Sequence, residues 1–301
     1  MAQLQILVDD LDRLFELATA APDVAMSRHV PRVYAEAGVD WRRWATPEFA
    51  ERFNGLMIRG RGEVGQVFAA CFPSAEILEQ WLALARPGDL LVTHHPIDGH
   101  PDGPREMSFV PIGSRHLAAI TGRGLSVYAV HAPMDTSLEV GTAAAIVEAL
   151  DGTVCGRFRP YGNGFAGLLC RVPPLSSAEL VAAARRIFKV DLVEVAGPQR
   201  AVIERIAVVG GIGDRVSEMT AAEELGAQAW LTGEIHVRIE GEPGRRKHAD
   251  VRAFAARTTM TLVGVSLAAS EQLVLRTQLT RWLAERHGLS PLLLDQPRWW
   301  R

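Results

Sequence analysis

The hydrophobic positions of this chain follow two different periods along most of its length. Short runs of apolar and β-branched residues are typical of buried strands, and segments with apolar residues three or four apart are typical of helices that bury one face. The two kinds of segment alternate at the spacing of β–α units, which predicts an α/β fold with mainly parallel sheets. Strands are predicted near 64–71, 89–94, 125–131, 191–195, 205–211, 227–233 and 261–267. Helices are predicted near 75–85, 115–121, 139–150, 178–188, 219–226, 248–257 and 271–286.

Two stretches depart from this alternation. Residues 153–172 predict two strands joined through the turn Tyr161-Gly162-Asn163-Gly164, so an antiparallel section interrupts the parallel layers. Residues 20–55 are broken by Pro31 and Pro47 and predict short helices and loops over the core.

Composition narrows the class of protein. A chain of 301 residues with 48% apolar content can bury a full core and forms one large domain or two packed ones. Its net charge of −3 gives no general attraction to nucleic acid, so nucleic acid is not an expected partner. The one dense basic run, at 245–247, is predicted to be a solvated loop.

The cysteines and the apolar runs bear on the compartment. Cys71, Cys155 and Cys170 are too few and too scattered for a disulfide framework, and each is predicted to be a small core residue. The first residues lack the basic region of a signal peptide, and no window approaches 18 uninterrupted apolar residues. No membrane span and a cytoplasmic location are therefore expected.

Two histidines follow a hydrophobic strand in the segment LVTHHP. His94 and His95 stand where the strand ends and the chain turns at Pro96, so both imidazoles can approach one centre from different angles. Neutral imidazole binds zinc, iron and similar metals, and active residues favour the carboxyl ends of parallel strands. The alternative is a solvated pair in a loop with no ligand.

A second strand runs into His131-x-x-x-Asp135. A carboxylate at this position can bridge two cations, and the histidine can donate to a ligand or act as a general base near a metal-bound water. A buried histidine hydrogen-bonded to an aspartate for purely structural reasons is the alternative.

Two glutamates and a glycine-rich turn complete the candidate chemistry. Glu234 directly follows a strand in LTGE, and Glu271 stands near the start of the last helix. The segment VVGGIG at 208–213 either cradles a phosphate or forms a tight strand-to-helix turn, and the turn is the simpler interpretation because the full dinucleotide fingerprint is missing.

The four motifs in this order, THHP, HxxxD, TGE and a helix-opening SE, resemble the Nif-three-like family of dinuclear metal-centre proteins, which includes homologues of type 2 GTP cyclohydrolase I. The resemblance begins at Phe53-Asn54-Gly55-Leu56 and extends to the C-terminus. It implies two α/β lobes with mixed, partly parallel sheets and a metal cleft between them, often in a homohexameric ring. The first lobe would comprise 1–134 and 232–301, with 1–52 as an atypical N-terminal extension, and the second 135–231.

The resemblance also assigns roles to residues. It implies metal ligation by His94, His95, Asp135 and Glu271, with Asp135 as the bridge. His131 and Glu234 then fall on positions that line the site and serve catalysis.

The sequence departs from the family where a histidine is expected four residues before the last glutamate. Leu267 stands there, and leucine cannot bind a metal. His236 and His248 are the candidate replacements, and the site holds either one ion or two.

The expected function is therefore that of a divalent-metal protein. A metal-dependent hydrolase would use a metal-bound water as nucleophile on a small, nucleotide-like substrate such as GTP, with zinc, iron or manganese as the metal. Arg159, Arg205 and Arg215 are candidate phosphate-binding groups. The alternative is a non-catalytic metal-binding ring or scaffold protein with a degenerate site, which the loss of a ligand at Leu267 favours.

Overall fold

The computed structural model describes residues 2–100, 108–236 and 242–295. The chain divides into two compact units, which are described one at a time. The first unit is formed by Met1–His100, Phe109–Val140 and Leu275–Pro297, and the second is built mainly from Gly141–Val274.

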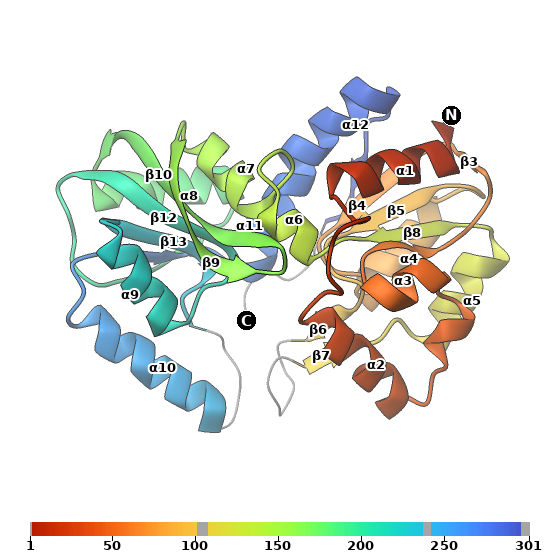
Figure 1. The fold of residues 1–301 in the computed structure, drawn as a ribbon, viewed down its shortest axis with the longest axis horizontal. Coiled ribbons are helices and arrows are strands. Elements are labelled where there is room, and N and C mark those ends of the chain that lie inside the picture. Colours follow the sequence, from red (N-terminus) through yellow and green to blue (C-terminus); the bar gives the residue numbers. More distant parts are fainter. Residues whose placement is uncertain (1, 101–107, 237–241, 296–301) are drawn as a thin grey trace. The chain divides into compact units, whose positions relative to one another are not determined.

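The first unit is organised around a five-stranded sheet in the order β15-β4-β5-β8-β2 (Figure 1). The first four strands in this order run parallel, and β2 pairs antiparallel with β8 at the edge. The strands are β2 (Gly55–Ile58), β4 (Val67–Ala70), β5 (Leu90–Thr93), β8 (Ser126–Ala129) and β15 (Leu292–Leu293). Two small sheets pair β1 (Ala2–Gln3) with β3 (Glu63–Val64) and β6 (Asp98–His100) with β7 (Ser108–Val110).

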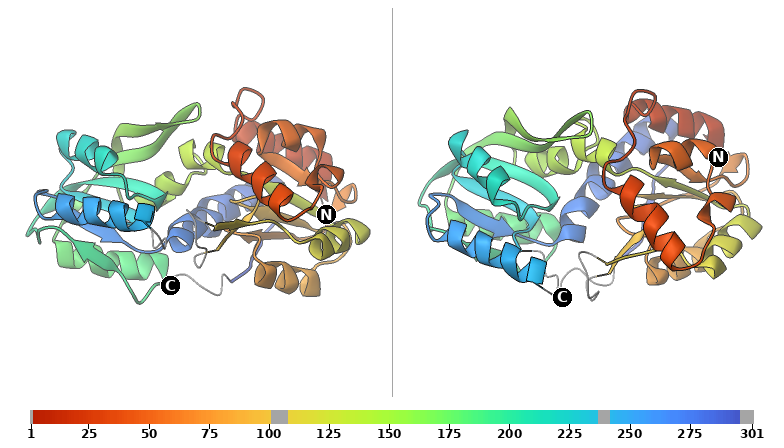
Figure 2. Two further views of the ribbon diagram at one scale, coloured as in Figure 1. Left: turned by 90° about the horizontal axis from the view of Figure 1, so that it is seen from below. Right: turned by 60° about the horizontal axis from the view of Figure 1, so that its bottom comes forward.

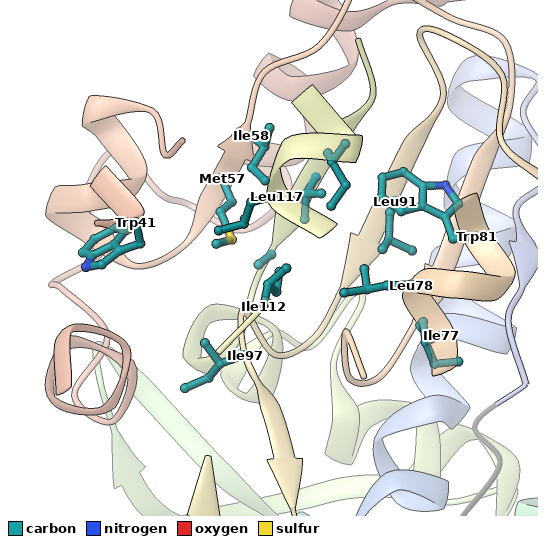
Figure 3. Packing of buried hydrophobic residues seen from close by; sticks show 14 of the residues in the cluster. Trp41, Met57, Ile58, Ile77, Leu78, Trp81, Leu91, Ile97, Ile112 and Leu117 are labelled. Carbon is teal, nitrogen blue, oxygen red and sulfur yellow. The ribbon is translucent and has the colours of Figure 1, made fainter. Parts of the chain in front are cut away.

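Helices cover this sheet and close its core. They are α1 (Leu4–Leu14), α2 (Met26–Glu36), η1 (Trp41–Arg43), α3 (Pro47–Arg52), α4 (Ala75–Leu84), α5 (Ser114–Gly122), α6 (Ala132–Thr136) and α12 (Thr280–His287). The Ser74 hydroxyl caps α4 by accepting from the Ile77 N–H, as the sequence of a helix start requires. Figure 3 shows Trp81 of α4, Leu91 of β5 and Leu117 of α5 in the buried cluster that joins helices and sheet.

The N-terminal residues are part of this core. The prediction of short helices in 20–55 is confirmed, and Pro47 begins α3, where a missing N–H costs nothing. Tyr34, Trp41, Phe49 and Phe53 are buried in the same cluster as the sheet. The segment expected as an atypical extension therefore supplies much of the aromatic core of the first unit.

The second unit contains a six-stranded sheet in the order β11-β14-β13-β12-β10-β9. The strands β12, β13 and β14 run parallel in the middle of the sheet. The strand β11 pairs antiparallel with β14 at one edge, and β10 and β9, the predicted antiparallel section, lie at the other. The strands are β9 (Thr153–Tyr161), β10 (Gly164–Leu175), β11 (Glu194–Ala196), β12 (Ile203–Ile212), β13 (Ala229–Glu234) and β14 (Thr261–Gly264).

Helices cover both faces of the second sheet. Three helices, α7, α8 and α11, share one face, and α9 and α10 pack on the other. The light blue helix α10 lies in front of the sheet in both views of Figure 2. Their bounds are α7 (Thr142–Ala149), α8 (Ser177–Phe188), α9 (Val216–Glu224), α10 (Glu242–Ala255) and α11 (Leu267–Val274). The mixed α/β class expected from the sequence is confirmed by both sheets.

Some boundaries differ from the sequence-based expectation. Residues 232–274 belong to the second unit rather than the first, because β14 pairs in parallel with β13 and extends its sheet. The last predicted helix starts earlier, at Leu267, and contains a π-helical stretch, Leu275–Leu279, before α12. None of the described helices combines the length and apolar character needed to cross a bilayer.

The basic run at 245–247 was expected in a loop and instead lies on α10. Arg246 pairs with Glu242 one turn earlier, and Lys247 Nζ lies 3.2 Å from Asp214 Oδ2. Because these cations are partly neutralised by acidic neighbours, the run does not form a concentrated positive patch.

Truncation of Trp41 tests whether the N-terminal segment belongs to the core. Trp41→Ala removes a side chain that is 3% exposed, and we expect it to lower the free energy of unfolding of the first unit by about 3–5 kcal/mol. The exposed neighbour Arg43→Ala is the control, with an expected change within about 0.5 kcal/mol. Urea unfolding measures both, and equal effects of the two substitutions would contradict this placement.

Candidate metal centre

Three neighbouring strands of the first unit end at one edge of their sheet. The pairing aligns the last residues of β4, β5 and β8 with each other. Backbone pairing continues one step further, since the His94 N–H donates to the Ala70 carbonyl at 3.3 Å and the His95 N–H to the Cys71 carbonyl at 3.0 Å. Both histidines are therefore carried to the carboxyl edge of the parallel strands, where functional residues commonly stand.

Three buried imidazoles gather at this edge. The ring centroids of His94 and His95 are 4.6 Å apart, and His131 lies 5.0 Å from His94 and 4.8 Å from His95. One ring nitrogen of each lies within 4.8 Å of the other two, close enough for a single cation to contact all three after small side-chain adjustments. The structure thus brings together His94 and His95, as expected from the strand-end pattern, and adds the His131 ring to them.

The His94 ring is oriented so that its Nε2 atom faces a carboxylate. Its Nδ1 lies 3.0 Å from the Val130 carbonyl, which can only accept, so Nδ1 carries the proton and Nε2 keeps a lone pair in the neutral ring. That Nε2 lies 3.5 Å from Asp135 Oδ1. Two ligands on a tetrahedral zinc ion would be about 3.3 Å apart, so this pair is already near a coordinating separation.

His95 is held by stacking and kept neutral by burial. The Phe72 ring lies face to face with the imidazole at 4.0 Å and 6°. Burial and the neighbouring His131 lower the pKa of His95 well below its usual range, against a smaller opposite effect of Asp23. Neutral imidazole is the form that binds a metal.

Asp23 fixes the orientation of His131. The His131 Nδ1 donates to Asp23 Oδ2 at 3.0 Å, which leaves Nε2 as the nitrogen that can accept a proton or bind a metal. The His131 N–H also donates to Asn54 Oδ1 at 2.7 Å, so the Asn-Gly-Leu segment positions the same residue through its backbone. A buried His–Asp hydrogen bond of the kind considered as the alternative is therefore present, but the partner of His131 is Asp23. Asp135 lies beside His94 instead.

The Asp23 carboxylate is buried and fully engaged. Oδ1 accepts from the N–H groups of Ala25 and Met26, and Oδ2 also accepts from the Ala132 N–H. Burial alone would raise the pKa of Asp23, but the His131 imidazole and these hydrogen bonds outweigh it and hold the pKa well below its usual range.

In the second unit, two glycines allow close packing around α11, and one of them makes room for Glu271. Gly211 has φ +67°, a conformation that favours glycine, and a Cβ there would collide with Glu271 Oε1. A Cβ on Gly233 would collide with the Gly211 carbonyl and the Ser270 hydroxyl. The GGIG segment was expected as a tight strand-to-helix turn, but Gly211 lies within β12 and lets α11 approach the sheet closely.

The other second-unit candidates fall on identifiable positions. Leu267 is the first residue of α11 and Glu271 lies one turn later, so a histidine at 267 would project from the same helix as the glutamate. Glu234 is the last residue of β13, and its carbonyl accepts from the Gly213 N–H.

The rings of His236 and His248, the two candidate replacement ligands, stack at 4.3 Å and 19°. In the described residues, neither belongs to a group of three metal-ligating side chains.

The structure therefore assembles His94, His95, His131 and Asp135 within the first unit, whereas Glu234 and Glu271 lie in the second unit. Convergence of Glu271 with the first-unit residues stays a prediction. Sequence reasoning missed Asp23, which lies in a stretch without a pattern. The prediction that Cys71 is a buried core residue is confirmed, and its place directly after a strand also matches that of His94.

Substituting Asp23 tests the hydrogen-bond network around His131. In Asp23→Asn, an NH₂ group replaces one of the two carboxylate oxygens, each of which accepts from two N–H groups. In either orientation of the amide, the NH₂ group therefore faces two donors and cannot accept from them. We expect the free energy of unfolding to fall by about 2–4 kcal/mol at pH 7.

The pH dependence of this stability deficit shows whether it comes from the lost negative charge or from the changed shape of the side chain. The depressed pKa of Asp23 means that its carboxylate stabilises the fold fully above about pH 4 and loses this contribution as the pH falls further. The deficit of Asp23→Asn should therefore shrink below about pH 4. Denaturant unfolding at several pH values measures it, with exposed Asp40→Asn as the control. A deficit independent of pH would contradict the assignment.

Most of the chain is similar to proteins named GTP cyclohydrolase 1 type 2 homolog. The relative from Vibrio cholerae is 24% identical over 245 residues, which is 80% of this chain and 88% of that protein. The relative from Pyrococcus abyssi is 26% identical over 248 residues, 81% of this chain and 89% of that protein.

Solved structures share the fold. TTHA1606 from Thermus thermophilus is similar with a TM-score of 0.64 at 18% identity, covering 99% of both chains. Reduced HcgD from Methanocaldococcus jannaschii is similar with a TM-score of 0.62 at 15% identity, covering 98% of both chains. The model of the family described as Duf34/NIF3 (NGG1p interacting factor 3) matches residues 42–240, the greater part of the sequence. The chain therefore belongs to the Duf34/NIF3 family.

Proposed function

We propose that this protein binds a divalent metal ion through His94, His95 and Asp135 and uses it to hydrolyse a small, nucleotide-like molecule. The observation that carries the proposal is the meeting of buried imidazoles with a carboxylate, with His94 Nε2 and Asp135 Oδ1 3.5 Å apart. A buried cluster of this kind is stabilised when a cation neutralises it and satisfies its lone pairs.

The donor set fits a transition metal. Two imidazole nitrogens with one carboxylate suit zinc, iron and manganese alike, so the residues limit the class of ion rather than its identity. The resemblance adds Asp135 as a bridge and Glu271 as a further ligand, and it predicts one or two ions per chain.

The chemistry follows from the bound ion and from His131. A divalent ion lowers the pKa of a water that it binds toward about 7 and so supplies a nucleophile at neutral pH. His131 holds its Nδ1 proton against Asp23, so its Nε2 is the atom that accepts a proton from the attacking water and returns it to the leaving group. Glu234 is the second group proposed to move protons.

The substrate class rests on the relatives. Their name, GTP cyclohydrolase 1 type 2 homolog, supports a nucleotide-like substrate. Of the three arginines suggested for phosphate binding, Arg159 and Arg215 both pair with Glu218, at 3.2 and 3.3 Å. Their charge is partly neutralised, which weakens the case for GTP itself. A homohexameric assembly and a cytoplasmic location remain proposals from the family resemblance and from the sequence.

A second candidate is a non-catalytic metal-binding scaffold. Leu267 favours it, because a protein without catalytic chemistry tolerates the loss of a metal ligand more easily than a hydrolase does.

Metal binding is tested on the full-length protein after chelation and dialysis. We expect the wild type to take up zinc or manganese, and His94→Ala and His95→Ala to weaken binding by at least about 100-fold, since even outer-sphere changes cost 10- to 100-fold. His29→Ala, outside the cluster, is the control. Competition titration with a chromophoric chelator measures the affinities, and unchanged binding in both variants would exclude the site.

Restoring the missing imidazole distinguishes the two candidate functions. Leu267→His should raise the number of ions bound or the affinity for the second ion, and Leu267→Ala, which adds no donor, should not. Both are compared with wild type by metal analysis and by hydrolysis of a nucleotide panel including GTP. If Leu267→His changes neither metal content nor turnover, residue 267 does not face the metal. Turnover by the metal-loaded wild type favours the hydrolase, and tight metal binding without turnover favours the scaffold.

A further inference from the structure

Cys71 occupies the same strand-end position as the candidate ligands. It directly follows β4, as His94 directly follows β5, and these two strands pair in parallel. Neighbouring parallel strands present the residues after their ends at one edge of the sheet. A cysteine at this place is therefore positioned with the histidines at the edge of the sheet.

The thiol is close to His95. One ring nitrogen of His95 and the Cys71 sulfur lie within 4.8 Å of each other, and Cys71 is fully buried. Sulfur and nitrogen ligands of one tetrahedral zinc ion are about 3.5 Å apart, so a small rotation of the side chains brings both to bonding distance.

The backbone holds the pair in place. The Cys71 carbonyl accepts from the His95 N–H at 3.0 Å, and the next residue, Phe72, stacks on the His95 ring. Because one short segment contacts both the backbone and the ring of His95, the thiol and the imidazole are held near each other before any ion arrives. Such preorganisation is characteristic of ligand sites.

We propose that Cys71 is a metal ligand of this site and makes it a mixed sulfur, nitrogen and oxygen centre. The inference rests on the proposed metal binding by His94, His95 and Asp135. The thiol loses its proton to solvent as the metal–sulfur bond forms, and the thiolate supplies a donor in a chain where Leu267 has removed an expected imidazole.

A sulfur ligand changes which ions the site prefers. Thiolates favour zinc and cobalt over harder ions such as manganese, which prefer oxygen. The wild type should therefore discriminate against manganese, and removal of the thiol should reduce that discrimination. We expect Cys71→Ser to weaken zinc binding by at least about tenfold and to change manganese binding much less.

Cobalt(II) substitution gives a direct spectroscopic test. The metal-free full-length protein is titrated with cobalt, and we expect a sulfur-to-cobalt charge-transfer band in the near ultraviolet with weaker visible bands from the other donors. Cys71→Ser should lose the near-ultraviolet band and keep the visible bands. Cys155→Ser and Cys170→Ser are matched controls that should leave the band intact, because among the described residues neither cysteine belongs to a group of three metal-ligating side chains.

A measurement on the wild type avoids dependence on a variant. X-ray absorption of the zinc-loaded protein should show a sulfur neighbour at about 2.3 Å. Cobalt or zinc bound with nitrogen and oxygen neighbours only would overturn the role of Cys71 and leave the proposed metal function intact. A charge-transfer band that persists in Cys71→Ser would also overturn it. Failure to bind either ion would overturn both proposals.

Discussion

The parallel pairing of β4, β5 and β8 is the constraint on which the candidate site depends. Its register sets the ends of three strands at one level, and the residues that follow are the ones that carry chemistry. A slip by one residue would turn each of these side chains to the opposite face of the sheet. The buried cluster of helix and strand side chains that fixes this register therefore also fixes the distances among His94, His95 and His131.

The fold class and the meeting of His94 with His95 could be predicted because their signals are local. Period-two and period-3.6 patterns mark buried strands and amphipathic helices wherever packing is regular, and His94 and His95 are recognisable directly after such a strand. The HxxxD spacing likewise set Asp135 one helical turn beyond His131, and α6 supplies that turn. The boundary of the second unit was harder to predict, since the choice of sheet for β14 depends on pairing between distant segments.

Residues that act through long-range contacts could not be predicted. Asp23 reaches His131 across 108 positions, and nothing in its neighbours distinguishes it from a surface aspartate that caps a turn. Gly211 gave an ambiguous signal, because a glycine shows that a side chain is excluded without showing what excludes it. In the structure the excluding group is Glu271. Cys71 was correctly predicted to be buried, but its apolar neighbours gave no sign that its thiol lies near His95.

The two hydrogen bonds on His131 have a consequence for the residues between their acceptors. Asp23 holds the ring and Asn54 holds the backbone of the same histidine, and the Asp23 N–H donates to the Arg52 carbonyl. Residues 24–53 thus form a long segment whose two ends are held together at His131. The exposed turns between its helices can lengthen with only a slow rise in the entropic cost of loop closure, provided that Asp23, Asn54 and the buried aromatic side chains remain. An insertion at the exposed residues 37–38 would then alter the surface of the first unit and leave the geometry at His131 unchanged, whereas a deletion that removed Trp41 or Phe49 would take away part of the core.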